Sequence, residues 1–437
     1  MKRSLALVLA LVMLISVCLT ACNGESKNTT TTTTQNDAEE PGTQDNLPVT
    51  LKIAGSDISE YTIVYARSEY YVKGPKVFTT EWDFYKLIAK DISEKIFALT
   101  GVTVKMTQDT KAADLGKEIL VGPTNRDQSD VYDAMDVYSY QNNVKDGKLV
   151  VGGGYDTSYL HEGLKKMYCW GATYRAFDHI VEYATEQAKA GKSEIDLAEG
   201  FEQKGSVELK TVACVGDSIT EGDKASDWHS TSWPPVLQRF LWKDYVVINY
   251  GKCGKTMRNN MDRRYNTCDQ FKAAQKHQEK FDLALIMLGT NDFLNDTDYS
   301  AADDKNFKDS ATEIVNMLTK NNSDLKLGIM NCPAYYGSKT SSFVHVRDLQ
   351  ADIYDDLIGK GYEAYFFDMF TFTNTALTAS RYPDKLHPND EGYALIGEKL
   401  STVVPAILDG SWDSGKQKVT SPAAQESALM PSDKKYY

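Results

Sequence analysis

Cysteine and histidine are scarce in this sequence, and basic residues are fewer than acidic ones. Of its 437 residues, seven are cysteines and six are histidines, and no two cysteines form a CxxC pair. The absence of a CxxC pair argues against a structural zinc site. Lysine and arginine number 48 against 61 acidic residues, which gives a formal net charge of −13. A surface of this sign repels nucleic acid, so we expect no nucleic-acid partner.

Long apolar runs are also missing after the first residues of the chain. Lys2 and Arg3 precede an uncharged apolar run over residues 5–19, and no second run of about 18 apolar residues follows. This start, which continues into Leu-Thr-Ala-Cys at Cys22, resembles a bacterial lipoprotein signal. The resemblance implies removal of residues 1–21, lipidation of Cys22 and an extracytoplasmic protein tethered to the outer face of a bacterial cell membrane. An ordinary cleaved signal peptide with an incidental Cys22 is the alternative.

Composition divides the rest of the chain into four parts. Residues 22–47 are polar, with six consecutive threonines at 29–34, and predict a disordered linker. Residues 48–205 contain short strand-like runs and two long helical segments, which predict a smaller accessory domain of α/β or α+β type. Residues 206–410 alternate regularly between strands and helices, which is typical of a doubly wound parallel sheet. Residues 411–437 predict a loosely held polar tail.

The expected elements follow from hydrophobic periodicity and from helix boundary signals. In the smaller domain, strands are expected at residues 49–53, 61–65, 102–106, 118–122 and 148–152, and helices from a cap at Thr80 to Gly101 and from 158 to 190. In the larger domain, strands are expected at 211–217, 246–251, 283–289, 326–332 and 364–370, and helices near 233–242, 269–280, 306–320, 344–358 and 390–408.

A serine stands at the end of the first expected strand of the larger domain. The apolar run at 211–217 breaks at Gly-Asp-Ser-Ile-Thr, residues 216–220, the pattern of a buried strand that turns tightly into a helix. The hydroxyl of Ser218 would face the crevice in which open α/β sheets bind ligands, beside helix N-terminal amides that can receive an oxyanion. A serine hydroxyl needs a base to become a good nucleophile.

His387 is the histidine best placed to serve as that base. It follows the fifth expected strand and comes three residues after Asp384, whereas the other five histidines fall in helical segments, near helix starts or in a polar loop. An isolated histidine is more often structural, and Asp384 lies between two prolines where it could simply form a turn. The presence of Ser218 favours a catalytic role for both.

Four stretches of the larger domain follow strand ends, so all of them can face one crevice. They read GDSIT at 216–220, NYGKCGKT at 249–256, GTND at 289–292 and DKLHPN at 384–389. Together they resemble the four blocks of the SGNH (GDSL-type) hydrolase family, in the family's order and spacing over residues 206–410. The resemblance implies an α/β fold with a flavodoxin-like, doubly wound sheet of five parallel strands.

The resemblance also assigns roles to individual residues. Ser218 is expected to be the nucleophile, His387 its base, and Asp384 the acid that orients the imidazole. The oxyanion donors are expected to be the amide of Ser218, the amide of Gly254 and the side chain of Asn291. Gly254 corresponds better to the family's glycine than the earlier glycine of the same block, although either glycine could only permit a turn. Asn291 could likewise only cap a helix.

The function implied is an esterase that forms an acyl-enzyme intermediate and needs no metal or cofactor. Within residues 48–205, the motifs at 53–55, 63–65, 118–126 and 149–153 resemble the noncatalytic N-terminal α/β domain of α-glucuronidases and β-hexosaminidases, which implies a carbohydrate-processing context. A generic domain is the alternative. We expect acylated carbohydrate as substrate and an O-acetyl group as the group removed. A lipase or lysophospholipase, an acyl thioesterase and a noncatalytic carbohydrate-binding lipoprotein are the other readings.

Aromatic residues near the expected crevice could stack on sugar rings, although each could equally be packing. They are Trp228, Trp233, Tyr335, Tyr336 and Tyr382. Among the cysteines, Cys253 and Cys268 fall in one polar loop region and form the best candidate for a disulfide. Cys214 and Cys332 lie in strand-like runs and are expected to be core residues.

Overall fold

The computed structural model describes residues 48–67, 83–132, 135–154, 170–293, 299–338 and 340–417. The chain from Pro48 onward forms one compact unit. The expected signal, the lipidation site Cys22, the linker and the end of the tail lie outside the described residues. Of the helices that the structure describes, none is both long and apolar enough to cross a membrane.

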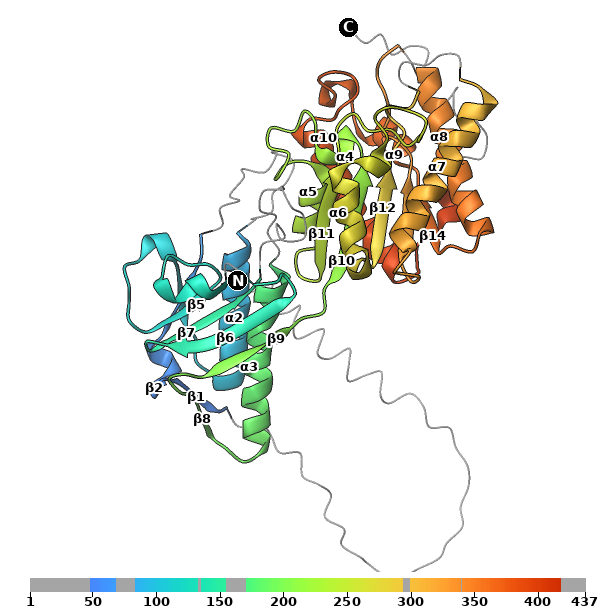
Figure 1. The fold of residues 1–437 in the computed structure, drawn as a ribbon. Coiled ribbons are helices and arrows are strands. Elements are labelled where there is room, and N and C mark those ends of the chain that lie inside the picture. Colours follow the sequence, from blue (N-terminus) through green and yellow to red (C-terminus); the bar gives the residue numbers. More distant parts are fainter. Residues whose placement is uncertain are drawn as a thin grey trace, which may run out of the picture. The chain divides into compact units, whose positions relative to one another are not determined.

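Five parallel strands form the central sheet of the C-terminal region (Figure 1). They are β10 (Lys210–Gly216), β11 (Tyr245–Gly251), β12 (Leu283–Met287), β13 (Lys326–Met330) and β14 (Ala364–Phe367). Their spatial order is β11-β10-β12-β13-β14, and each neighbouring pair is parallel. In chain order this is 2-1-3-4-5, the flavodoxin-like order. The predicted fold class is therefore confirmed.

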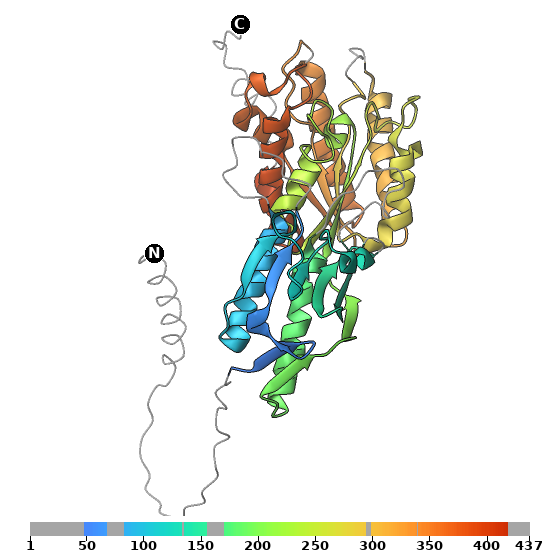
Figure 2. The same cartoon turned by 90° about the vertical axis from the view of Figure 1, so that its left-hand side faces the viewer.

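Helices cover both faces of this sheet (Figure 2). They are α4 (Ser218–Glu221), α5 (Trp233–Phe240), α6 (Asp269–His277), α7 (Ala301–Thr319), α8 (Thr340–Gly359), α9 (Met369–Ala376) and α10 (Asp390–Leu408). Val212 and Cys214 of β10 belong to a core cluster with α5 and α10, whereas Ala213 and Val215 belong to a cluster with α6, α7 and α8. Because successive side chains of a strand alternate between faces, a strand covered on both sides must be apolar throughout.

Three helices of this region differ from expectation at their starts or altogether. Helix α8 begins at Thr340, four residues before its predicted start. Helix α7 begins five residues before the predicted start, because Ser300 and Asp303 form a capping box in front of a polar first turn. Helix α9 was not predicted. It begins where the fifth strand was expected to continue, and Asp368 caps it by accepting the N–H of Thr371 at 2.9 Å. Residues Met369 and Phe370 are therefore helical rather than extended.

The N-terminal region contains a six-stranded sheet in the order β4-β3-β5-β7-β6-β9. Its strands are β3 (Thr62–Tyr65), β4 (Lys105–Gln108), β5 (Glu118–Val121), β6 (Ser139–Lys145), β7 (Lys148–Gly153) and β9 (Glu202–Ser206). Strand β6 runs antiparallel to both of its neighbours, β7 and β9, and the remaining neighbouring pairs are parallel. Strands β6 and β9 were missed in the sequence because their residues are mostly polar.

A second, three-stranded sheet and two helices complete the N-terminal region. The sheet has the order β2-β1-β8, formed by β1 (Thr50–Ile53), β2 (Ser56–Asp57) and β8 (Glu194–Leu197). Helix α2 (Phe84–Thr100) ends at Gly101 as predicted, but its N-cap is Asp83, while the expected cap Thr80 lies outside the described residues. Helix α3 (Gly171–Lys189) matches the second part of the helix predicted over 158–190, whose residues 158–169 lie outside the described residues.

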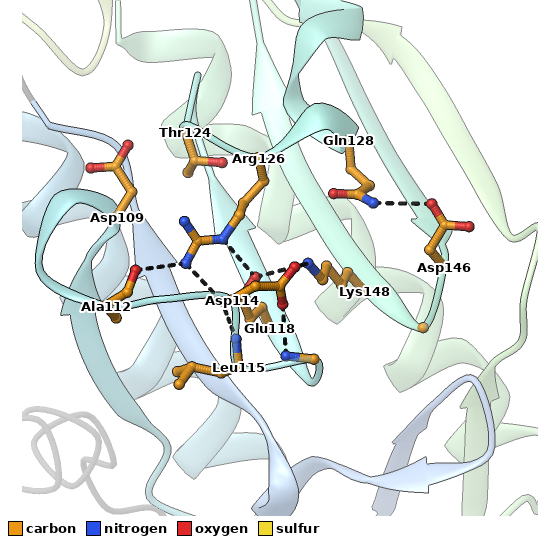
Figure 3. A network of polar contacts seen from close by, with 12 residues as sticks. Asp109, Ala112, Asp114, Leu115, Glu118, Thr124, Arg126, Gln128, Asp146 and Lys148 are labelled. Carbon is orange, nitrogen blue, oxygen red and sulfur yellow. Dashed lines mark hydrogen bonds and ion pairs between the residues drawn. The ribbon is translucent and has the colours of Figure 1, made fainter.

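A buried ion-pair network lies at the start of β5 (Figure 3). Glu118, which is fully buried, accepts hydrogen bonds from Arg126 Nη2 at 2.9 Å and from the N–H of Leu115 at 3.0 Å. Lys148 Nζ lies 3.2 Å from Glu118 and 2.5 Å from Asp114. Burial acts to raise the pKa of Glu118, but these hydrogen bonds outweigh it and hold the pKa below its usual value. Since the carboxylate of Glu118 is bound by Arg126, by the N–H of Leu115 and by Lys148, we assign the motif at 118–126 a structural role.

The polar tail begins with an ordered segment. Trp412 donates its ring N–H to the carbonyl of Phe366 in β14 at 2.9 Å, and Ser414 accepts the N–H of Phe366 at 3.0 Å. Ser414 is buried. The expectation of a loosely held tail from residue 411 is therefore wrong up to Gln417, because this segment pairs with the sheet edge.

Candidate active site

Ser218 begins helix α4 directly after β10. Asp217 is the N-cap residue and accepts the N–H of Ile219 at 3.0 Å, so the chain turns sharply from strand to helix at the serine. Ser218 is 2% exposed, and its Oγ lies 2.8 Å from Nε2 of His387. The structure thus brings the predicted nucleophile and the predicted base, 169 residues apart in the chain, into hydrogen-bonding contact.

Asp384 holds His387 in place through both its carboxylate oxygens. Its Oδ2 lies 2.7 Å from Nδ1 of the imidazole. Its Oδ1 accepts the backbone N–H groups of Leu386 at 3.0 Å and His387 at 2.7 Å. Burial acts to raise the pKa of Asp384, but the hydrogen bonds from His387 and Leu386 outweigh it and lower the pKa. The carboxylate therefore stays ionised at neutral pH and favours the tautomer with a proton on Nδ1 and a free lone pair on Nε2.

The loop that carries Gly254 is tied to both neighbouring blocks. Glu221 of α4 accepts the N–H of Cys253 through Oε2 at 2.6 Å. The side-chain amide of Asn291 donates to the carbonyl of Lys255 at 2.9 Å. Since an amide nitrogen has two hydrogens, Asn291 keeps a second one for another acceptor. The peptide of Gly254 is therefore held between two anchored neighbours.

The structure also distinguishes the two glycines of this block. The N–H of Gly251 donates to Asn249 Oδ1 at 2.8 Å, so it is already satisfied. A Cβ on Gly251 would lie 2.1 Å from the backbone N of Glu221, which shows that this glycine permits close packing of β11 against α4. Gly254 has a φ of +72° and open space around its Cα, with no Cβ contact below 3.4 Å. Gly254 is thus the better candidate for an oxyanion donor, and this role stays a prediction.

Comparison with known proteins agrees with this geometry. Residues 212–400 match the family described as GDSL-like Lipase/Acylhydrolase. We call residues 212–400 the GDSL-type region, after the family that they match.

A curated protein that is similar to part of this chain is an acetylxylan esterase from Xylanibacter ruminicola, 38% identical over 81 residues. That match covers 18% of this chain and only 16% of the relative's length. Among solved structures, a carbohydrate acetylesterase family member from Sinorhizobium meliloti has 22% identity and a TM-score of 0.36 and covers 46% of this chain and 100% of its own. A family two carbohydrate esterase from Clostridium thermocellum in complex with cellohexaose has 18% identity and a TM-score of 0.37, with coverages of 48% and 69%.

Two buried aspartates of the GDSL-type region were not singled out in the sequence. Asp292, next to Asn291, accepts the backbone N–H groups of Met257 at 2.9 Å and Arg258 at 2.7 Å. Burial raises the pKa of Asp292 to about 6 and that of Asp217 to about 6. The negative charge of Asp217 adds to the rise at Asp292. Both aspartates could have been recognised in the sequence, because Asp217 belongs to the GDSIT block and Asp292 to the GTND block.

Asp390 is another residue whose contribution the sequence alone did not reveal. It begins α10, three residues after His387, and accepts the N–H and the hydroxyl of Ser226 at 2.7 and 2.6 Å. It also accepts the hydroxyl of Thr231 at 2.8 Å. Asp390 thereby ties the loop after the nucleophile helix to the segment that carries the base. In the sequence it could only be recognised as an acid in the first turn of a helix.

The aromatic candidates of the GDSL-type region fall into two groups. Trp233 and Tyr382 are buried in the core between the sheet and α10. For these two, the packing alternative therefore holds, and neither can present a ring face to a sugar. The other three candidates are half-buried: Trp228, Tyr335 and Tyr336.

The cysteines of the GDSL-type region are free thiols wherever the structure describes them. Cys253 is exposed. Cys268, the residue that precedes helix α6, is buried. The disulfide expected between them is therefore wrong, because sharing one loop region did not bring their side chains together. Cys214 and Cys332 are buried core residues, as predicted.

Proposed function

We propose that this chain is a serine esterase that removes O-acetyl groups from carbohydrate through an acyl-enzyme intermediate. The observation that carries the proposal is the continuous set of contacts from Ser218 Oγ to His387 Nε2 at 2.8 Å and from His387 Nδ1 to Asp384 Oδ2 at 2.7 Å. This is the arrangement that general-base activation of a serine requires.

The reaction would run in two halves. His387 Nε2 takes the hydroxyl proton of Ser218 while Oγ attacks the ester carbonyl, and the resulting oxyanion accepts hydrogen bonds from the amides of Ser218 and Gly254 and from Asn291. The tetrahedral intermediate collapses, Nε2 gives its proton to the leaving alcohol, and an acyl-serine remains. Water then attacks the acyl group with His387 as base, which releases the acid and restores Ser218.

The choice of an acetyl group and a carbohydrate rests on similarity. The curated relative is an acetylxylan esterase, and the matched stretch covers 16% of its length. The resemblance of residues 118–126 and 149–153 to domains of carbohydrate-processing proteins points the same way. Half-buried Trp228 and Tyr335 provide aromatic surface of the kind that sugar rings stack on.

The direct test is the Ser218→Ala variant. We expect its hydrolysis of p-nitrophenyl acetate to fall at least about a thousandfold and its labelling by a fluorophosphonate probe to disappear. The matched control is Ser323→Ala, which removes an exposed hydroxyl just before β13, at the opposite end of the sheet from Ser218. A Ser218→Ala protein with unchanged activity, or a wild type that is neither active nor labelled, would contradict the proposal and favour a binding protein.

Substrate choice needs separate measurements. Acetate release from acetylated xylan, pectin, mannan and sialoglycan would identify the carbohydrate, with Ser218→Ala as the blank. Comparison of acetyl, octanoyl and palmitoyl esters would test the acyl group, and a preference for the long chains would indicate a lipase or thioesterase instead.

We further propose that the protein is anchored outside the cell through lipid on Cys22. The support is the sequence of residues 1–22 alone. Wild-type protein from a bacterial host should partition into the detergent phase, and Cys22→Ser should move it to the aqueous phase. Equal partitioning of the two would argue for an ordinary signal peptide.

A further inference from the structure

A second carboxylate stands beside the catalytic histidine, and its backbone is firmly held. Asp223 follows Gly222, the C-cap of α4. Its N–H donates to the carbonyl of Ser218 at 2.9 Å, and its own carbonyl accepts the hydroxyl of Tyr393 at 2.7 Å. Tyr393 is fully buried in the core. The position of Asp223 relative to the nucleophile is therefore fixed by contacts that do not involve its side chain.

The side chain of Asp223 approaches the ring nitrogen of His387 that Asp384 does not contact. Lys224 Nζ lies near both carboxylates, 4.0 Å from Asp384 Oδ2. The Oδ2 of Asp223 is 3.7 Å from Nε2 of His387, the nitrogen that also faces Ser218. Its Oδ1 is 3.3 Å from Nζ of Lys224, whose backbone adopts a φ of +67°. The Asp223 side chain is 34% exposed, so part of the carboxylate is open to a ligand.

Neither ring nitrogen of His387 requires Asp223 as an orienting partner. Nδ1 faces Asp384 at 2.7 Å and Nε2 faces Ser218 at 2.8 Å, so the triad already fixes the ring. The carboxylate of Asp223 is instead placed where the leaving alcohol must arrive. That alcohol oxygen has to come within about 3 Å of Nε2 to receive its proton.

This proximity brings the substituents of the leaving alcohol to Asp223. Since Nε2 is 3.7 Å from Asp223 Oδ2, the leaving oxygen lies within about 7 Å of that carboxylate oxygen. A hydroxyl on the adjacent carbon of the alcohol can bridge this gap and donate a hydrogen bond to it. A hydrogen bond to a charged acceptor is about twice as strong as one between neutral groups.

We infer that Asp223 determines specificity by accepting a hydrogen bond from a hydroxyl next to the ester, so that the site selects monoesters of vicinal diols, the arrangement found in sugars. The inference rests on the proposed esterase function. It explains how a site with few accessible ring faces can recognise a carbohydrate. It concerns the alcohol side of the ester only and places no requirement on the acyl group.

The test compares two small esters that differ in one hydroxyl. For wild type, kcat/KM for trans-1,2-cyclohexanediol monoacetate should exceed that for cyclohexyl acetate by about tenfold or more, as expected for a hydrogen bond to a charged group. Asp223→Ala should bring the ratio close to one. Asp223→Asn, which retains a neutral acceptor, should give an intermediate ratio. Asp269→Asn is the control, because it removes the same charge from a side chain that is 93% exposed.

The possible outcomes are distinct. A wild-type ratio near one, or an unchanged ratio in Asp223→Ala, overturns the inference and leaves the esterase proposal intact. Equal losses on both esters in Asp223→Ala also overturn it, since they would mean that Asp223 acts on the histidine. Failure of the wild type on both esters, with no fluorophosphonate labelling, would instead refute the proposed function itself.

Discussion

Replacing Asp384 by asparagine and by alanine separates two contributions that one carboxylate makes to this site. Oδ2 contacts Nδ1 of His387, while Oδ1 accepts the backbone N–H groups of Leu386 and His387. The first contact sets the protonation of the ring, and the other two stabilise the turn. Asp384→Asn should lower activity more than Asp384→Ala does, and Asp384→Ala should lower stability more than Asp384→Asn does.

Asparagine should retain the turn and reverse the tautomer. The two backbone donors require an oxygen at Oδ1, so the new NH₂ group must take the place of Oδ2 and face Nδ1. His387 would then accept at Nδ1 and carry its proton on Nε2, where it could no longer take the proton of Ser218. We expect kcat to fall by about 10⁴ and the free energy of unfolding to change by less than about 1 kcal/mol.

Alanine should disturb the turn more and the chemistry less. His387 would be free to adopt the productive tautomer but would lose a charge-assisted hydrogen bond in its imidazolium form, which corresponds to a loss of about 10- to 200-fold in kcat. Two backbone N–H groups would lose their acceptor. Because the side chain of Asp384 is 34% exposed, water can replace part of that contact, and we expect a loss of about 1 kcal/mol or more in stability.

Steady-state hydrolysis of p-nitrophenyl acetate and urea denaturation of the same preparations would measure both effects. The reasoning requires that Asp384→Asn be slower than Asp384→Ala and yet more stable. If alanine proves the slower variant, the tautomer argument is wrong. If asparagine proves the less stable variant, Oδ1 does not hold the turn.

Three further predictions concern other parts of the structure. Glu118→Gln should destabilise the protein by roughly 3–5 kcal/mol at pH 7. Because the folded pKa of Glu118 is lowered, its contribution should be complete above the unfolded value of about 4.3, decline below that value and be lost once pH has fallen through the folded pKa, so that urea midpoints of wild type and variant converge in acid. Gly251→Ala should prevent normal folding, since its Cβ would overlap the backbone of Glu221, whereas Gly254→Ala should cost only about 1–2 kcal/mol for its left-handed φ; circular dichroism melts would compare them. Asn291→Ala should lower kcat by about 10²–10³ because it removes an oxyanion donor, and should lower stability by about 1 kcal/mol because it also removes the hydrogen bond to the Lys255 carbonyl.

Much of the C-terminal fold could be predicted because its signals are local. Each strand of the five-stranded sheet is a short apolar run, and the first three of the four blocks lie at the ends of such runs, whereas helix α9 separates the fourth block from β14. Helix α10 begins and ends where its periodicity indicated, at Asp390 and Leu408. The elements that escaped prediction, such as β6 and α9, have polar or ambiguous sequences whose state is set by neighbours that pair with them or cap them.

The sequence by itself determined which residues could do chemistry here: a serine after a strand, a histidine with an acid three positions before it, and a glycine and an asparagine in two further loops. Only the tertiary structure decided how they are supported. Asp390 fastens the nucleophile loop to the helix after His387, Glu221 anchors the Gly254 loop, and Asp223 stands at Nε2 of His387. These contacts join residues that are distant in the chain, and spacing along one sequence contains no information on which distant side chains will meet. The parallel sheet brings them together because it gathers the ends of its strands at one edge.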